Sequence, residues 1–76
     1  MSNETVVCDV TMLKKGDEVH YYNRDEGEFL IDKGVLKEDN LYSDGVEVHG
    51  DGWKQYVSKW FICKVERVGE VIFTSR

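Results

Sequence analysis

The chain has 76 residues, a formal net charge of −5 at neutral pH and a pI near 4.9. This length allows a single domain, residues 1–76, and the acidic balance argues against non-specific binding to a phosphate backbone. β-Branched and aromatic residues fill 26 positions, whereas Ala is absent and Leu occurs four times, so the composition favours strands over helices.

The first half of the chain is predicted to form three strands separated by polar turns. Apolar and polar residues alternate in the second of them, and Gly-containing turns separate the runs. In the third strand, Asp32–Gly34 interrupts the pattern and is expected to form a bulge. All seven glycines are expected in turns or loops. The expected strands are Thr5–Val10, Glu18–Asn23 and Glu28–Leu36.

The second half is predicted to contribute a further strand and two hairpin turns. Leu41–His49 is expected to be extended, with a kink or a second turn at Ser43–Gly45, and Gly50–Gly52 gives a strong hairpin signal. The chain is expected to end in a hairpin of Cys63–Val68 and Val71–Thr74.

Residues 52–61 allow two interpretations. Five apolar residues fall at i, i+3, i+4, i+7 and i+8, the spacing of a helical face, which gives an α+β alternative with a helix at 52–61. Trp, Tyr, Val and Phe are poor helix formers, however. We therefore favour a strand at Trp53–Val57 followed by one helical turn near residues 58–61.

Two short segments resemble parts of a known architecture. Leu13-Lys14-Lys15-Gly16-Asp17-Glu18-Val19 resembles the opening of SH3-like, Tudor-like and KOW-like small barrels, and Gln55–Ile62 resembles their close, a strand followed by a one-turn helix. The resemblance implies an all-β fold, a small SH3-like barrel of five or six short antiparallel strands. The aromatic motif and the Pro-containing turn of the SH3 peptide groove are missing, as is the KOW glycine pattern, so the resemblance implies no function.

No residue pattern indicates catalysis or a bound cofactor. His20, His49, Cys8 and Cys63 are the soft metal-ligand candidates, and they lack the close pairing of structural zinc sites, so no metal is expected. The two cysteines have apolar neighbours and are expected to be inert core thiols. The chain is therefore predicted not to be an enzyme and to have no catalytic residues.

The N-terminal sequence and the apolar runs give an expectation for location. Met1–Glu4 begins no hydrophobic leader, and the longest apolar run, Trp60–Cys63, is far shorter than a membrane span. We expect a cytoplasmic protein with reduced thiols and no membrane partner.

The aromatic residues are the strongest functional signal. Tyr21, Trp60 and Phe61 are expected in the core, whereas other rings are expected to be exposed, and exposed Trp and Tyr are typical binding anchors. The predicted partner-binding residues are Tyr22, Tyr42, Trp53, Tyr56, Lys54 and Lys59.

These observations predict a non-catalytic protein-interaction module, in its most concrete form a small acidic inhibitor or modulator of a larger, nucleic-acid-handling enzyme. Residues 17–51 carry a net charge of −8 (11 acidic and 3 basic residues), which would steer the domain towards a basic surface. The alternative is a nucleic-acid-binding barrel that uses the Lys, Arg and aromatic residues of 53–67.

Overall fold

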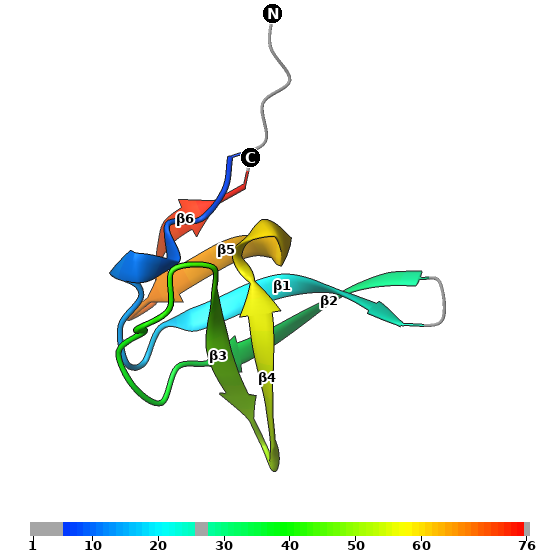
Figure 1. Ribbon diagram of the computed structural model, residues 1–76, viewed down its shortest axis with the longest axis horizontal. Helices are drawn as coiled ribbons and strands as arrows, with labels where there is room; N and C mark the ends of the chain where they lie inside the picture. Colours follow the sequence, from blue (N-terminus) through cyan, green and yellow to red (C-terminus); the bar gives the residue numbers. More distant parts are fainter. Residues whose placement is uncertain (1–5, 26–27, 76) are drawn as a thin grey trace, which may run out of the picture.

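The computed structural model describes residues 6–25 and 28–75, and the side chains of residues 6–23 and 31–75. Within this range the chain forms six antiparallel strands in one sheet and two 3-10 turns, with no α-helix, so the predicted all-β class and strand number are confirmed (Figure 1). The elements are η1 (Val10–Met12), β1 (Glu18–Asp25), β2 (Glu28–Val35), β3 (Gly45–Gly50), β4 (Trp53–Ser58), η2 (Lys59–Phe61), β5 (Ile62–Arg67) and β6 (Glu70–Thr74).

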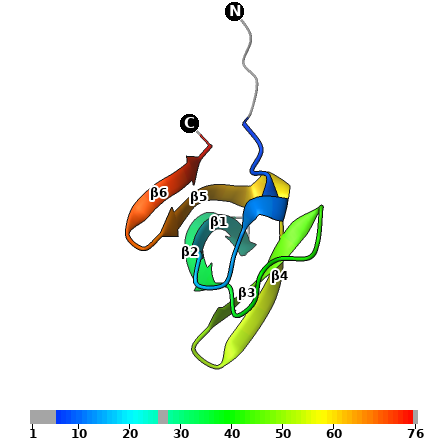
Figure 2. The same ribbon diagram turned by 90° about the vertical axis from the view of Figure 1, so that its left-hand side faces the viewer.

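The sheet has the order β4-β3-β2-β1-β5-β6 and is strongly curled. The β3–β4 hairpin turns away from the long β1–β2 hairpin, and the β5–β6 hairpin lies beyond β1 (Figures 1 and 2). In the part of the sheet that is described, β4 and β6 do not pair with each other, so the sheet bends around a core without closing. None of the described helical segments has the length and hydrophobicity needed to span a lipid bilayer.

One hydrophobic core fills the inner face of the curled sheet. Alternate residues of the strands point inwards, and the segment before β1 adds side chains from outside the ladder. Tyr21 is 1% exposed, which confirms its predicted place in the core. The buried apolar residues are Cys8, Val10, Leu13, Val19, Tyr21, Leu36, Val46, Val48, Val57, Ile62 and Val65.

The N-terminal segment is not the strand that was predicted at Thr5–Val10. Residues 6–9 make no strand pairing and the next three form η1, whereas Thr5 lies outside the described residues. The Asp9 side chain accepts a hydrogen bond from the Thr11 amide at 3.1 Å and caps η1. The chain therefore turns at Asp9 and buries apolar side chains without joining the sheet.

A buried ion pair fixes the turn before β1. Asp17 is 1% exposed, and its carboxylate accepts hydrogen bonds from Nε and Nη2 of Arg67 and from the Lys14 amide, each at 2.8 Å. Burial alone would raise the pKa of the Asp17 carboxyl, but these hydrogen bonds outweigh it and hold that pKa below its ordinary value. Arg67 Nη2 also donates to the Met12 carbonyl at 3.1 Å, so the end of β5 holds both η1 and the turn.

The strands from β2 to β3 differ from the prediction in two places. The β1–β2 register runs without a shift through Asp32–Gly34, so the predicted bulge there is wrong, and register shifts occur instead in β1–β5 and β5–β6. β3 begins at Gly45 rather than Leu41. The reason is Asn40, whose Nδ2 donates to the carbonyls of Val10, Tyr42 and Gly45 at 2.8, 2.9 and 3.1 Å. These bonds hold the preceding residues in a loop.

Residues 53–61 form a strand and one helical turn, which confirms the favoured interpretation and excludes the helix at 52–61. β4 pairs with β3 along its whole length, and Ser58 caps η2 by accepting a hydrogen bond from the Trp60 amide. The expectation that Trp60 and Phe61 belong to the core is wrong, since they are 65% and 52% exposed. The helical turn directs both rings outwards, away from the inner face of the sheet.

Candidate functional site

Two tyrosines meet on the outer face of the β3–β4 hairpin. The rings of Tyr42 and Tyr56 lie edge to face, with centroids 5.5 Å apart and an interplanar angle of 88°. Tyr56 projects from β4 beside Glu47 of β3, and Tyr42 comes from the loop before β3. The two residues are 53% and 51% exposed, so the pair is presented to solvent.

Glycines in β3 support the aromatic side chains. A Cβ atom at Gly45 would lie 2.7 Å from Cζ and Oη of Tyr56, so the ring rests directly on the glycine backbone. Trp53 lies over Gly50 in the same way, on the other face of the hairpin. These glycines are strand residues rather than turn residues, as is Gly34 in β2, whereas Gly16, Gly52 and Gly69 do lie in turns with positive φ.

The six predicted partner-binding residues do not form one surface. Tyr42 and Tyr56 are in contact, and Lys54 lies on the same face of β4, beside His49. Trp53 lies on the opposite face of that strand at the hairpin tip. Tyr22 projects from the outer face of β1, with β2 between it and the hairpin, and Lys59 lies in η2.

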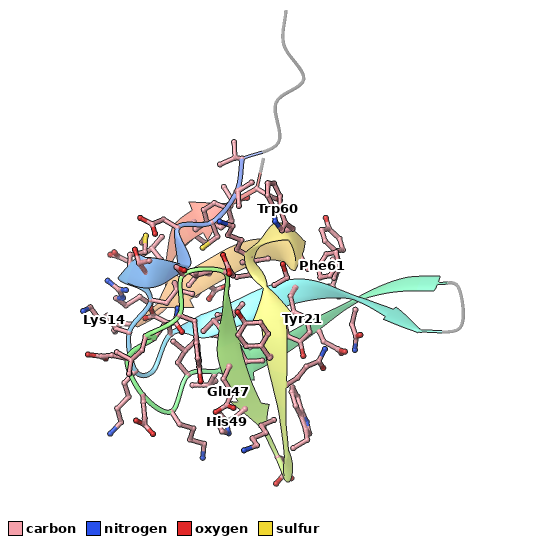
Figure 3. The ribbon with its side chains drawn as sticks, in the orientation of Figure 1. Lys14, Tyr21, Glu47, His49, Trp60 and Phe61 are labelled. Carbon is pink, nitrogen blue, oxygen red and sulfur yellow. The ribbon has the colours of Figure 1, made fainter. Side chains whose placement is uncertain are left out.

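η2 directly follows β4 and carries two further exposed rings at the end of the hairpin away from its turn. Figure 3 shows Trp60 and Phe61 projecting from η2, between β4 and β5. The Lys59 amide donates to the Asp44 carbonyl at 2.9 Å, which holds η2 against the loop that carries Tyr42. The Lys59 ammonium lies over the Trp60 ring, 5.8 Å from its centroid. We call the residues Tyr42, Tyr56, Trp60 and Phe61 the aromatic end.

A shallow pocket of about 170 Å³ adjoins the aromatic end. Its walls are residues 36–42 and the side of β3 that bears Glu47 and His49, which project together in Figure 3. Nε2 of His49 lies 3.1 Å from Oε1 of Glu47. Three acidic residues line the pocket against one lysine, so it is an anionic hollow: Glu38, Asp39 and Glu47 against Lys37.

Two basic side chains of residues 53–67, the segment that the nucleic-acid alternative would use, already form ion pairs within the domain. Lys64 Nζ lies 2.9 Å from Oε2 of Glu66, and Arg67 is bound to the buried Asp17. Lys54 lies near the start of β4, and Lys59 lies in η2, beyond the end of that strand. The residues therefore do not converge on one cationic surface.

The two thiols are protonated at neutral pH. Burial, with a smaller contribution from Asp9, raises the pKa of Cys8 to about 11. Burial also raises the pKa of Cys63, whose Sγ donates to the His20 carbonyl at 3.3 Å. Neither side chain is an activated nucleophile.

A cluster that the sequence did not reveal lies on the outer face of β1 and β5. It consists of Glu18, His20 and Glu66, whose potential ligand atoms all lie within 4.8 Å of one another. Its members come from strands far apart in the sequence. The signal that was available is the Glu-x-His spacing, which places two side chains on the same face of a strand.

The chain matches no protein-family model, no curated protein and no solved structure. Its function is therefore argued from the arrangement of its own residues.

Proposed function

We propose that this chain is a non-catalytic protein-interaction module that binds a basic segment of another protein through the aromatic end and the adjoining pocket. The observation that carries the proposal is the Tyr42–Tyr56 pair, two rings in edge-to-face contact that are each about half exposed. Grouped exposed aromatic residues mark interaction sites on small soluble domains.

The surroundings of the pair support the proposal because they hold it in place before a partner arrives. Tyr56 rests on Gly45, and Asn40 fixes the loop of Tyr42 through its hydrogen bonds to three carbonyls. A surface that is already ordered loses less conformational entropy on binding. This favours recognition by contact with a fixed surface.

The charge of the pocket supports a basic partner. Acidic residues line a hollow beside rings that can pack against the aliphatic stem of a Lys or Arg side chain. The net charge of −5 steers the domain towards a positive surface. In its most concrete form, the partner is a nucleic-acid-handling enzyme whose basic groove the domain occupies. The proposal includes membership of the SH3-like small barrels, which the six antiparallel strands and the turn η2 before β5 support.

The test is capture of a partner by immobilised domain from a lysate of the cells in which the protein occurs, followed by mass spectrometry. Tyr42→Ala and Tyr56→Ala are each expected to reduce capture of the enriched protein about tenfold, as expected for an aromatic anchor. Tyr22→Ala is the matched control, because Tyr22 is a similarly exposed tyrosine on β1. Equal capture by the wild type, Tyr42→Ala and Tyr56→Ala, or equal loss with Tyr22→Ala, would refute the assignment.

Titration with labelled single- and double-stranded oligonucleotides at low and moderate salt separates this proposal from nucleic-acid binding. We expect no binding, because Lys64 and Arg67 are engaged in ion pairs. Affinity that falls steeply with salt would favour the alternative.

A further inference from the structure

The cluster on β1 and β5 has the geometry of three ligands around one centre. Nε2 of His20 lies 3.0 Å from Oε1 of Glu18 and 3.7 Å from Oε2 of Glu66. Glu18 and Glu66 are direct partners in the β1–β5 register, and His20 follows Glu18 on the same face. All three side chains are partly exposed, so an ion can reach them from solvent.

The two carboxylates of this cluster favour binding of a cation. Two carboxylates directly opposite each other on neighbouring strands destabilise a sheet unless positive charge lies between them. Lys64, at 2.9 Å from Glu66, partly meets this need, and Lys33 lies beside His20 in the β1–β2 register. Glu18 forms an ion pair with His20, and the Lys64 ammonium also interacts with it electrostatically.

We propose that Glu18, His20 and Glu66 bind a divalent first-row transition-metal ion, with Zn²⁺ as the representative, and that water completes the coordination. Tetrahedral zinc with metal–ligand distances near 2.0–2.1 Å holds its ligand atoms about 3.3 Å apart. The observed separations of 3.0 and 3.7 Å from Nε2 lie on either side of that value. One imidazole and two carboxylates form a ligand set that suits zinc better than Mg²⁺ or Ca²⁺, which prefer oxygen ligands alone.

The sheet supplies the rigidity that such a site needs. β1 is paired on both sides, with β2 and β5, so the backbones that carry the ligands are fixed. Only the flexible Lys64 side chain has to leave Glu66 when the metal binds. The site is separate from the aromatic end and does not depend on the proposed function.

The hairpin β3–β4 contains a similar residue pair that serves as a control for metal binding. Glu47 and His49 repeat the Glu-x-His pattern, with Nε2 of His49 3.1 Å from Oε1 of Glu47. Their partners on β4 are Tyr56 and Lys54, so this pair has no opposing carboxylate. It offers two ligands where the first cluster offers three.

The experiment is calorimetric titration of the full chain with ZnCl₂ in a buffer that does not chelate metal. We expect one equivalent of Zn²⁺ to bind. His20→Asn and Glu66→Gln should each weaken binding by about tenfold or more, because loss of a residue that merely orients a metal ligand already costs about tenfold. His49→Asn and Glu47→Gln should change the affinity less than twofold. Lys64→Met should tighten binding, because it removes the ammonium that competes for Glu66.

NMR of the wild-type chain gives a readout that does not depend on the folding of any variant. The NMR resonances of the His20 imidazole nitrogens should shift on addition of Zn²⁺, and the shift should saturate at one equivalent. The corresponding resonances of His49 should not shift. Absence of a His20 shift, or an equal loss of binding in His49→Asn and His20→Asn, would overturn the proposal.

Discussion

Asp17 is the one buried charged side chain among the residues that the structure describes. Its carboxylate is buried and receives three hydrogen bonds, two of them from one guanidinium. A bidentate Arg–carboxylate pair has directional geometry that a lysine cannot reproduce. Asp17 therefore joins the turn before β1 to the end of β5 and orients the first strand on the core.

Asp17→Asn should lower the free energy of unfolding by about 2–3 kcal/mol at pH 7, because it leaves Arg67 without its counter-charge. The folded-state pKa of Asp17 lies below the unfolded value near 3.8, so the ion pair stabilises the protein fully above that pH and progressively less as the pH falls through the folded-state pKa. Urea denaturation from pH 7 to pH 2.5 should show the gap between wild type and variant narrowing on acidification.

Asp44→Asn, a change at an exposed carboxylate, is the control and should leave the stability nearly unchanged. A gap between wild type and Asp17→Asn that stays constant or widens at low pH would contradict this account of the ion pair.

For single residues, the sequence predicted burial correctly in some cases and wrongly in others. Tyr21 was expected in the core and lies there, because strand alternation directs it inwards beside Val19. Trp60 and Phe61 have the same hydrophobic character but lie in a 3-10 turn that directs them outwards. Hydrophobicity alone does not report that direction, so these exposed rings could not be assigned to the surface before the backbone was known.

Among the elements, the β5–β6 hairpin carries local strain. Its two-residue turn consists of Val68 and Gly69, both with positive φ, at 50° and 81°. Such turns ordinarily place Asn, Asp or Gly at both positions, because a β-branched side chain is disfavoured there. Val68 is almost fully exposed, so no packing offsets the cost.

Val68→Asn is expected to stabilise the domain by about 1 kcal/mol, since Asn adopts the left-handed conformation more readily than Val. Thermal and urea denaturation measure the change. Val71→Asn makes the same chemical change inside β6, where φ is not positive, and should give no gain. A loss of stability in Val68→Asn would show that the turn does not strain this valine.

Elements defined by local signals were predicted well, whereas those defined by distant contacts were not. Gly52 and Gly69 mark the hairpins β3–β4 and β5–β6 correctly. The start of β3 depends on Asn40, whose partners include Val10, thirty residues earlier. The contact between Tyr42 and Tyr56 follows from that same loop, so the sequence identified both rings as exposed but gave no reason for them to meet.

At the scale of the whole molecule, the open sheet leaves β4 and β6 as edges. Unpaired edge strands are sites of association between copies, and net charge opposes it. At neutral pH the charge of −5 keeps copies apart, whereas near the pI of 4.9 this repulsion disappears. The apolar character of β6, with Val71, Ile72 and Phe73 in succession, makes it the edge most prone to pairing.

Val71→Lys should reduce light scattering near pH 5 more than Val6→Lys does. Both valines are 54% exposed and both changes add the same charge, but only Val71 lies on an edge strand. Static light scattering between pH 4.5 and 7.5 measures the difference. Equal suppression by the two variants would mean that charge alone controls association and that the edge has no special part in it.

The class of the fold was predictable because composition acts on the whole chain. A chain rich in Val and aromatic residues and lacking Ala favours strands wherever they pair. The order of the strands could not be predicted from neighbouring residues, because it depends on how the hairpins pack against one another around the core. Glu18 and Glu66 become neighbours only through that order, so the sequence offered the Glu-x-His spacing of β1 but not the third member of the cluster.

The placement of the two cysteines allows partial unfolding of the domain to be followed by thiol labelling. Cys8 belongs to the N-terminal segment outside the sheet and is buried, whereas Cys63 belongs to β5 and is half-buried. An alkylating reagent reaches Cys8 when the N-terminal segment lifts, even if the ladder stays intact. The alkylation rate of the half-buried Cys63 rises when β1 and β5 separate and its Sγ loses the hydrogen bond to the His20 carbonyl. The ratio of the two labelling rates therefore distinguishes peeling of the N-terminal segment from global unfolding in the unmodified chain.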